Sequence, residues 1–262
     1  MKNRKDIRCA MTIAGSDSGG GAGIQADMLT FAANGVFATS AIAAITAQNP
    51  NGVSSISTVP IDTFRAQMDS VFDFFAPKVV KTGMLFDAEH INAVADFIKN
   101  NNIYAIVDPV MISTSGTRLL KTDAEDALKE NLLPLAYLIT PNLDEAKAIL
   151  NEDNDNIEEL AQKLSEKFST NVLLKGGHLD GDDIEDILLL KTGKKYSYKS
   201  PRIHNIDTHG SGCTLSAAIA ANIAKGFDLE KACQCARDYL ISGMKSPVIA
   251  GSRAFINHFP KK

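Results

Sequence analysis

Short apolar runs alternate with segments of helical spacing along most of the chain. Apolar or β-branched runs bounded by Gly, Pro, Asn or Asp are typical of buried strands, and apolar residues three and four apart are typical of helices. The predicted strands are 9–14, 79–85, 103–107, 136–139 and 172–175. The predicted helices are 24–34, 61–75, 88–99, 124–132, a helix ending at 150, 157–168, a helix following 216, and 229–244. This alternation predicts a three-layer α/β/α sandwich with a mostly parallel central sheet.

The C-terminal third departs from the alternation in two places. Residues 184–190 and 194–199 are strand-like on either side of Thr192-Gly193, which predicts an antiparallel pair. The tail after Lys245 has no regular spacing of apolar residues and is expected to be irregular. Because no composition shift, repeat or linker divides the sequence, we expect a single domain over residues 1–262.

The composition narrows the function to small-molecule chemistry. The chain has 262 residues, of which 45% are hydrophobic, and its formal net charge is −4. Its lysines are scattered rather than clustered, which argues against nucleic-acid binding. The polar N-terminus, residues 1–8, is not followed by the apolar h-region of a signal peptide, and no apolar run approaches the roughly 18 residues of a membrane span. We therefore expect a cytoplasmic protein that binds no membrane.

The cysteines also favour a cytoplasmic protein. The four of them, Cys9, Cys213, Cys233 and Cys235, have spacings that fit neither zinc ligation nor a disulfide framework. Reduced thiols are expected.

Polar loops follow two of the predicted strands. A glycine loop, residues 15–23, follows the first strand, and Asp108 follows the strand at 103–107. Such loops meet at the carboxyl ends of the strands, where open α/β sheets bind ligands. The alternatives are a loop that is merely flexible and a carboxylate that only caps a turn.

Gln48 precedes a turn at 49–52 that places it near the same edge of the sheet. Its side-chain amide offers donors and an acceptor, which suits a heteroaromatic ring carrying an amino group. A glutamine before a turn is, however, most often simply solvated.

Residues 207–216, DTHGSGCTLS, lead into an alanine-rich helical segment. Small residues at a helix start let several backbone N–H groups turn toward one point, so this stretch is a candidate anion hole. A thiol at a helix N-terminus has its pKa lowered from about 8.5 toward neutrality, which would make Cys213 a usable base. Alternatively, the glycines form a tight turn and Cys213 is a small buried hydrophobe. No Walker A loop or dinucleotide fingerprint is present.

Asn142 and Glu145 lie three residues apart at the start of a predicted helix. A carboxylate beside an amide oxygen suits magnesium, which takes oxygen ligands and keeps much of its water. The same pair also suits a capping box, and the sequence leaves both interpretations open.

Seven motifs, in order, resemble the ribokinase-like superfamily and, within it, the hydroxymethylpyrimidine/phosphomethylpyrimidine kinase family of thiamine biosynthesis. The resemblance covers nearly the whole chain. The motifs are AGSDSGGGAGIQAD (14–27), TAQN (46–49), KTGML (81–85), DPVM (108–111), TPNLDEA (140–146), KGGH (175–178) and THGSGCT (208–214). Two departures are Ser211, where threonine or alanine is usual, and the tail at 251–258, which lacks the usual glycine and proline.

The resemblance implies a ribokinase-like fold and an ATP-dependent kinase that uses Mg²⁺. It implies that the anion hole for the transferred phosphoryl group lies at 210–213 and that Cys213 is the catalytic base. The implied residues are, for catalysis, Gly210, Ser211, Gly212 and Cys213; for the substrate, Gln48, Gly15, Asp27, Met84 and Val110; for the nucleotide, Lys175, Thr208 and Lys245; and for the metal, Asp108, Asn142 and Glu145.

The implied substrates are 4-amino-5-hydroxymethyl-2-methylpyrimidine and its monophosphate, and a homodimer is expected. Pyridoxal kinases of the same subgroup are the alternative, and Gln48 favours the pyrimidine because the resembling pyridoxal kinases tend to carry an apolar residue there. A vitamin-binding protein without activity is a further alternative, which the intact Asn142, Glu145, Gly212 and Cys213 disfavour.

Overall fold

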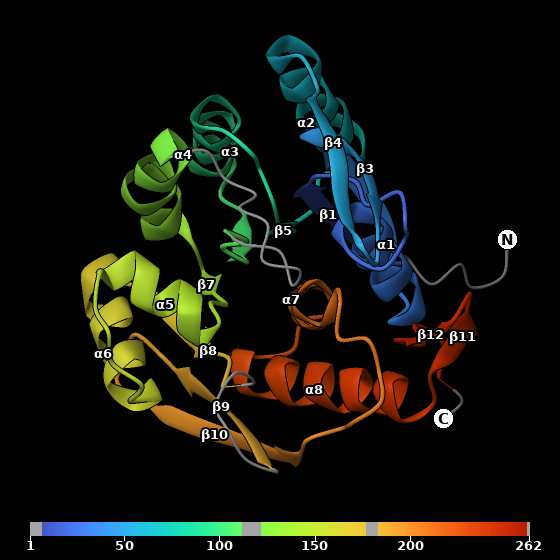
Figure 1. Ribbon diagram of the computed structural model, residues 1–262. Helices are drawn as coiled ribbons and strands as arrows, with labels where there is room; N and C mark the ends of the chain where they lie inside the picture. Colours follow the sequence, from blue (N-terminus) through green and yellow to red (C-terminus); the bar gives the residue numbers. More distant parts are fainter. Residues whose placement is uncertain (1–6, 112–121, 177–182, 261–262) are drawn as a thin grey trace, which may run out of the picture.

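The computed structural model describes residues 7–111, 122–176 and 183–260. Within these ranges the central sheet has eight strands in the order β10-β9-β8-β7-β6-β5-β1-β2, and it confirms the α/β sandwich predicted from the sequence (Figure 1). The strands from β2 to β8 in this order are parallel, whereas β9 and β10 are antiparallel to their neighbours. The bounds are β1 Cys9–Ala14, β2 Phe37–Ile42, β5 Val79–Thr82, β6 Tyr104–Val107, β7 Leu138–Ile139, β8 Asn171–Leu174, β9 Asp183–Leu189 and β10 Lys195–Pro201.

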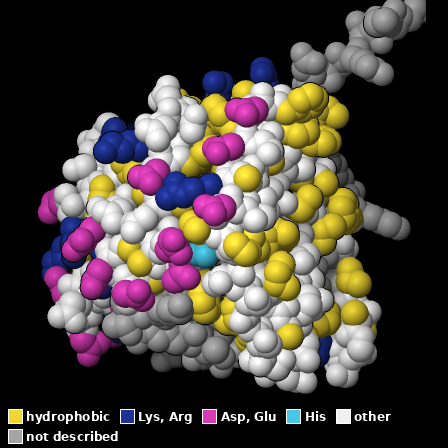
Figure 2. Space-filling model, turned by 90° about the horizontal axis from the view of Figure 1, so that it is seen from above, with side chains coloured by type: hydrophobic (Ala, Val, Ile, Leu, Met, Phe, Trp, Pro, Cys, Tyr) yellow, Lys and Arg dark blue, Asp and Glu magenta, His cyan; other side chains and the backbone are white. Residues whose placement is uncertain are grey.

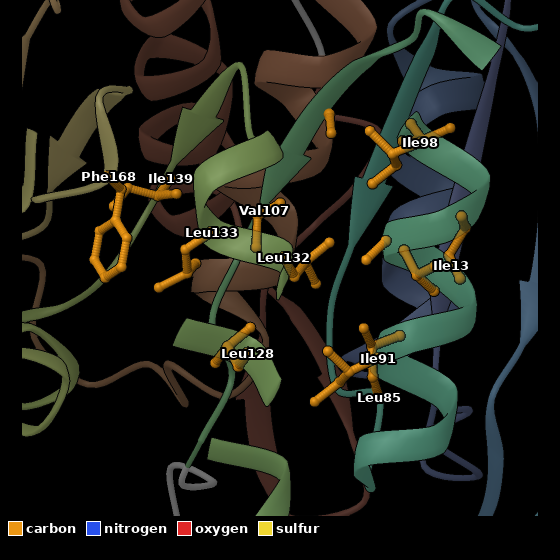
Figure 3. Close-up of a cluster of buried hydrophobic side chains, with 14 of the residues drawn as sticks. Ile13, Leu85, Ile91, Ile98, Val107, Leu128, Leu132, Leu133, Ile139 and Phe168 are labelled. Atoms are coloured by element: carbon orange, nitrogen blue, oxygen red, sulfur yellow. The ribbon is translucent and has the colours of Figure 1, made fainter. Parts of the chain in front are cut away.

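Helices cover both faces of the sheet because successive strand residues point to opposite sides. Met11 and Ile13 belong to one buried cluster, whereas Ala10 belongs to the other. The first cluster, part of which is drawn in Figure 3, packs under α2 Ile61–Phe75, α3 Ala88–Asn101, α4 Thr122–Ala127, α5 Leu143–Leu150 and α6 Ile157–Phe168, with a π turn at Leu128–Leu132 and a 3₁₀ turn at Leu133–Leu135. The second packs under α1 Gly23–Ala33, α7 Ser211–Ala224 and α8 Leu229–Lys245.

Helix α7 owes its central position to its small side chains. Ala217, Ala218, Ala220 and Ala221 are all fully buried, and alanine combines the highest helix propensity with the closest approach to neighbouring elements. In Figure 1 this helix is seen nearly end-on, next to α8. The packing sets the start of α7 at the edge of the sheet where the parallel strands end.

Two short hairpins were not predicted. Residues 37–49 form β2 of the central sheet and then β3 Ala44–Asn49, and β3 pairs with β4 Gly52–Thr58 in a separate two-stranded sheet that extends toward the top of Figure 1. The tail, expected to be irregular, contains β11 Val248–Ala250 paired with β12 Arg253–Phe255. Strands β4, β11 and β12 contain no buried residue, and β11 and β12 are only three residues long, so hydrophobic periodicity gives little signal for them.

Charged and apolar side chains are distributed unevenly over the face drawn in Figure 2. Acidic and basic side chains are interspersed on its left half, and hydrophobic side chains gather on its right. Among the described residues, no helix is long and apolar enough to cross a membrane.

Candidate active site

A cavity of about 830 Å³ lies where the parallel strands end. Its walls come from the loops that follow β1, β5, β6, β7 and β8 and from the start of α7. The sequence-predicted residues that line it are Gly15, Gln48, Met84, Asp108, Val110, Asn142, Glu145, Lys175, Thr208, Gly210, Ser211, Gly212 and Cys213. Gly177 and His178 of the KGGH motif lie outside the described residues.

Two candidates are not brought to the cavity. Asp27 is fully buried, with both carboxylate oxygens 2.8–2.9 Å from the Lys81 Nζ and one of them also accepting from the Thr12 hydroxyl. Lys245 is exposed at the last residue of α8. Neither is among the described residues that line the cavity, so the expected contacts with substrate and nucleotide stay predictions.

The start of α7 faces the glycine loop across a contact that tolerates only glycine. Gly210 has φ of +79°, and a Cβ there would lie 1.8 Å from the carbonyl oxygen of Gly21. The first N–H groups of a helix have no partner within it, which leaves those of Gly212 and Cys213 at the cavity wall. The N–H of Ser211 instead donates to the Thr208 carbonyl at 3.0 Å.

Cys213 does not have the lowered pKa expected of a thiol at a helix start. Burial raises its pKa to about 11, and the Asp27 and Asp108 carboxylates act in the same direction, whereas the Lys81 ammonium opposes them. Helix dipole and lysine together stabilise the thiolate less than the loss of water destabilises it. The prediction was wrong because the fold buries this thiol, and because the acidic neighbours that add to the rise in its pKa come from distant parts of the sequence.

A buried ion pair joins the ends of β6 and β8. The Lys175 Nζ donates to Asp108 Oδ1 at 3.0 Å, and the Thr140 and Ser216 hydroxyls donate to the same carboxylate at 3.1 and 3.3 Å. Although burial opposes ionisation, the Lys175 and Lys81 charges hold the pKa of Asp108 below its usual value. A lysine held this way presents a fixed positive charge to the cavity beside Gly212.

Asn142 and Glu145 form the capping box that the sequence left open. Asn142 Oδ1 accepts from the Glu145 N–H at 2.8 Å, and Glu145 Oε2 accepts from the Asn142 N–H at 2.9 Å. Burial raises the pKa of Glu145 to about 7, and the nearby Asp108 adds to the rise.

These carboxylates also fit a hydrated magnesium ion. Two acidic groups crowded together at the cavity wall are typical of a place where a cation would relieve their repulsion. Among the described residues, no cluster of three acidic, His or Cys side chains is arranged as a direct metal cage. Mg²⁺ keeps several waters and binds through few carboxylates and through phosphate oxygens.

Sequence reasoning gave no role to Asp17 and His209, which connect the glycine loop with the α7 loop. The His209 Nε2 lies 2.9 Å from Asp17 Oδ2 and 3.2 Å from the Gln48 side-chain nitrogen. Asp17 also accepts from the N–H groups of Gly19, Gly21 and Ala22. Their places inside two of the seven motifs were the available signal, although the contact joins residues 192 positions apart.

The far end of the cavity holds a second buried ion pair that the sequence did not reveal. Arg237 of α8 binds Asp186 of β9, and Asp186 Oδ1 accepts from the Gly176 N–H at 2.9 Å. A Cβ at Gly176 would lie 2.0 Å from the Glu185 carbonyl oxygen. These contacts hold the backbone directly after Lys175.

Comparisons with known proteins place the whole arrangement in one family. The family model described as phosphomethylpyrimidine kinase matches residues 17–256. A curated relative from Haemophilus influenzae, named hydroxymethylpyrimidine/phosphomethylpyrimidine kinase, is 44% identical over 96% of this chain and 95% of its own.

Solved structures give the same result. A phosphomethylpyrimidine kinase from Clostridium difficile is 39% identical with a TM-score of 0.80, covering 89% of this chain and 98% of that one. A Bacillus subtilis pyridoxal kinase, solved as an ADP complex, is 33% identical with a TM-score of 0.89, covering 97% and 98%. With the family model spanning most of its length and its fold shared by these kinases, the chain belongs to the phosphomethylpyrimidine kinase family.

Proposed function

We propose that the chain transfers a phosphoryl group from ATP to the hydroxymethyl oxygen of 4-amino-5-hydroxymethyl-2-methylpyrimidine, and then a second one to that monophosphate. The observation that carries the proposal is that Gln48 contacts His209, the residue directly before Gly210. An amide suited to an aminopyrimidine thus lies next to the backbone that opens the anion hole. One cavity holds both.

Phosphoryl transfer needs alignment and charge neutralisation more than covalent chemistry. Gly212 and Cys213 offer N–H groups to the transferred group, and Lys175 places its ammonium beside them. Thr208 lines the same wall, next to the Ser211 amide that its carbonyl holds. Gly15, Met84 and Val110 line the pocket for the pyrimidine ring.

Asp108, Asn142 and Glu145 are the residues that would hold magnesium, through its water shell. When bound, the ion neutralises charge on the phosphate oxygens of the nucleotide. Lys175 keeps Asp108 ionised, as the ion pair requires.

Cys213 accepts the proton of the substrate hydroxyl as the new P–O bond forms, and this role predicts a pH profile. The active form is the thiolate, and the thiol pKa of about 11 makes it scarce at neutral pH. Raising the pH raises the thiolate fraction, so kcat/KM should rise about tenfold per pH unit between pH 7 and 9. Steady-state kinetics across this range measure the slope. A flat profile would contradict a base of this pKa.

Coupled ADP release with Mg²⁺ and ATP tests the proposed substrates, with hydroxymethylpyrimidine, its monophosphate and pyridoxal offered in parallel. We expect turnover of both pyrimidines and slow turnover of pyridoxal. Turnover of pyridoxal alone would assign the chain to the alternative activity while leaving phosphoryl transfer intact. If none of these compounds gave ADP release, the chain would be a protein that binds its ligand without catalysis.

The remaining parts of the proposal concern the protein's surroundings. We place this single-domain kinase in the cytoplasm as a homodimer that binds neither nucleic acid nor membrane. An exposed aromatic group formed by Phe37, Phe74 and Phe75 supports self-association, because contiguous exposed apolar surface marks interaction sites.

A further inference from the structure

His209 is held between two side chains that make opposite demands on its ring nitrogen. Its Nε2 lies 2.9 Å from Asp17 Oδ2 and 3.2 Å from the side-chain nitrogen of Gln48. An ionised carboxylate only accepts hydrogen bonds, and the amide nitrogen only donates them. Nε2 has one position for a proton, so it cannot satisfy both contacts as an acceptor and a donor at once.

The ionisation of Asp17 determines whether His209 Nε2 carries a proton. Three backbone N–H groups and His209 converge on its carboxylate, and although burial opposes ionisation, these hydrogen bonds hold the pKa of Asp17 below its usual value. A carboxylate that stays ionised requires a proton on His209 Nε2. An amino group of Gln48 facing this N–H would set one donor against another, so the group of Gln48 at this position must be the carbonyl oxygen, which shares the proton with Asp17.

The other end of the Gln48 amide meets the same kind of constraint at Thr46. The Thr46 hydroxyl lies 2.7 Å from the Ser16 carbonyl oxygen and 3.3 Å from Gln48 Oε1. A hydroxyl has one proton, and the Ser16 carbonyl, which only accepts, lies at the shorter distance. Thr46 can therefore only accept a hydrogen bond from Gln48. The end of the Gln48 amide that faces Thr46 must then be a donor.

Turning the Gln48 amide by 180° satisfies both ends together. The two ends of an amide have nearly the same shape, so their assignment follows from the hydrogen-bond network. With the carbonyl oxygen toward His209 and the amino group toward Thr46, every donor in the chain Ser16–Thr46–Gln48–His209–Asp17 meets an acceptor.

We propose that His209, held by Asp17, is a positioning residue that fixes the orientation of the Gln48 amide and so sets which ring edge the cavity accepts. The inference rests on the proposed function. In this orientation Gln48 has one oxygen lone pair and one N–H left for the ring, in a fixed order. The oxygen can accept from the amino group of the ring, and the N–H can donate to the bare ring nitrogen beside it. A 4-oxo pyrimidine presents these groups in the reversed order, because its oxygen accepts and its N3–H donates.

The packing around the imidazole supports this positioning role. A Cβ at Gly21 would lie 2.9 Å from His209 Cδ2, so the ring rests on the backbone of the glycine loop. The backbone N–H of His209 donates to Asp207 Oδ1 at 2.9 Å, which fixes the backbone on the other side.

The test compares two substrates that differ only at this edge, 4-amino-5-hydroxymethyl-2-methylpyrimidine and its 4-oxo analogue. The unchanged chain should favour the amino compound in kcat/KM by about 10²-fold or more, since buried polar groups left unpaired reject a mismatched ligand strongly. In His209→Ala the amide is free to turn, and this preference should fall by about tenfold or more, with the KM for ATP unchanged.

Two further variants separate positioning from general damage. His209→Gln sets an amide nitrogen near the position of Nε2 and should restore most of the preference. Thr46→Val frees the other end of Gln48 and should lower the preference as His209→Ala does. Ser54→Ala, on the same hairpin but exposed, is the matched control and should keep it.

The outcomes distinguish this inference from the proposed function. If the unchanged chain phosphorylates the amino compound but His209→Ala and Thr46→Val keep its full preference, His209 has no positioning role and the kinase assignment stands. If the unchanged chain phosphorylates neither pyrimidine, the proposed function fails, and the inference fails with it.

Discussion

Replacing Cys213 by serine should lower kcat by about 10²–10⁴-fold, the usual contribution of a general base. Serine keeps the size of the side chain and the backbone N–H of the anion hole, so binding of ATP should change little. The expected loss of kcat has a chemical cause, because a hydroxyl is a far weaker acid than a thiol and forms no accessible anion between pH 7 and 9. Single-turnover kinetics with saturating ATP and pyrimidine measure the loss without interference from product release.

Cys235→Ser is the matched control, since this thiol lies on α8 and outside the cavity lining described above. It should retain full activity. The pH slope expected of the unchanged chain should disappear in Cys213→Ser and persist in Cys235→Ser. A Cys213→Ser variant with full activity would remove the base from the mechanism.

Replacing Lys81 by methionine should lower the free energy of unfolding by about 3–5 kcal/mol. Lys81 and Asp27 are both fully buried, with the ammonium 2.8 Å from one carboxylate oxygen. Removing one partner of a buried pair leaves an uncompensated charge, and this penalty exceeds the loss of the contact itself. Urea denaturation followed by circular dichroism measures the change in unfolding free energy.

Two variants show whether the unpaired charge is the cause. Lys81→Met/Asp27→Asn removes the carboxylate charge while leaving Thr12 a partner, and it should recover at least half of the loss. Arg65→Met breaks the exposed Arg65–Asp96 pair, whose side chains are 45% and 63% accessible, and should cost about 0–1 kcal/mol. An equal loss in the single and double variants would attribute the effect to packing instead.

Elements with strong local signals could be predicted from the sequence alone. Helix α6 has the predicted bounds, because Asn156 caps its first N–H groups and one face, containing Leu160, Leu164 and Phe168, is apolar. The hairpin strand β4 was missed because its residues, GVSSIST, are mostly small or polar and none of them is buried. Periodicity identifies strands only where one face is buried.

The same limit applies to the site. Gly15, Met84, Asp108, Asn142 and Lys175 could be predicted because each follows a parallel strand, and such strands end at one edge. The pKa of Cys213 could not be predicted, because it depends first on burial and then on Lys81, Asp27 and Asp108, which the fold alone brings near it. The contact between Asp17 and His209 is of the same kind, and Asp27 was assigned to the substrate although Lys81 neutralises it in the core.

The central claim is that this cavity phosphorylates a hydroxymethylpyrimidine twice, and product identity tests it most directly. Phosphorus NMR of the purified chain with hydroxymethylpyrimidine and excess MgATP follows both products over time. The account predicts that the monophosphate signal appears first and then gives way to the diphosphate, with two ADP formed per pyrimidine. ATP hydrolysis to inorganic phosphate with the pyrimidine left unmodified would contradict it.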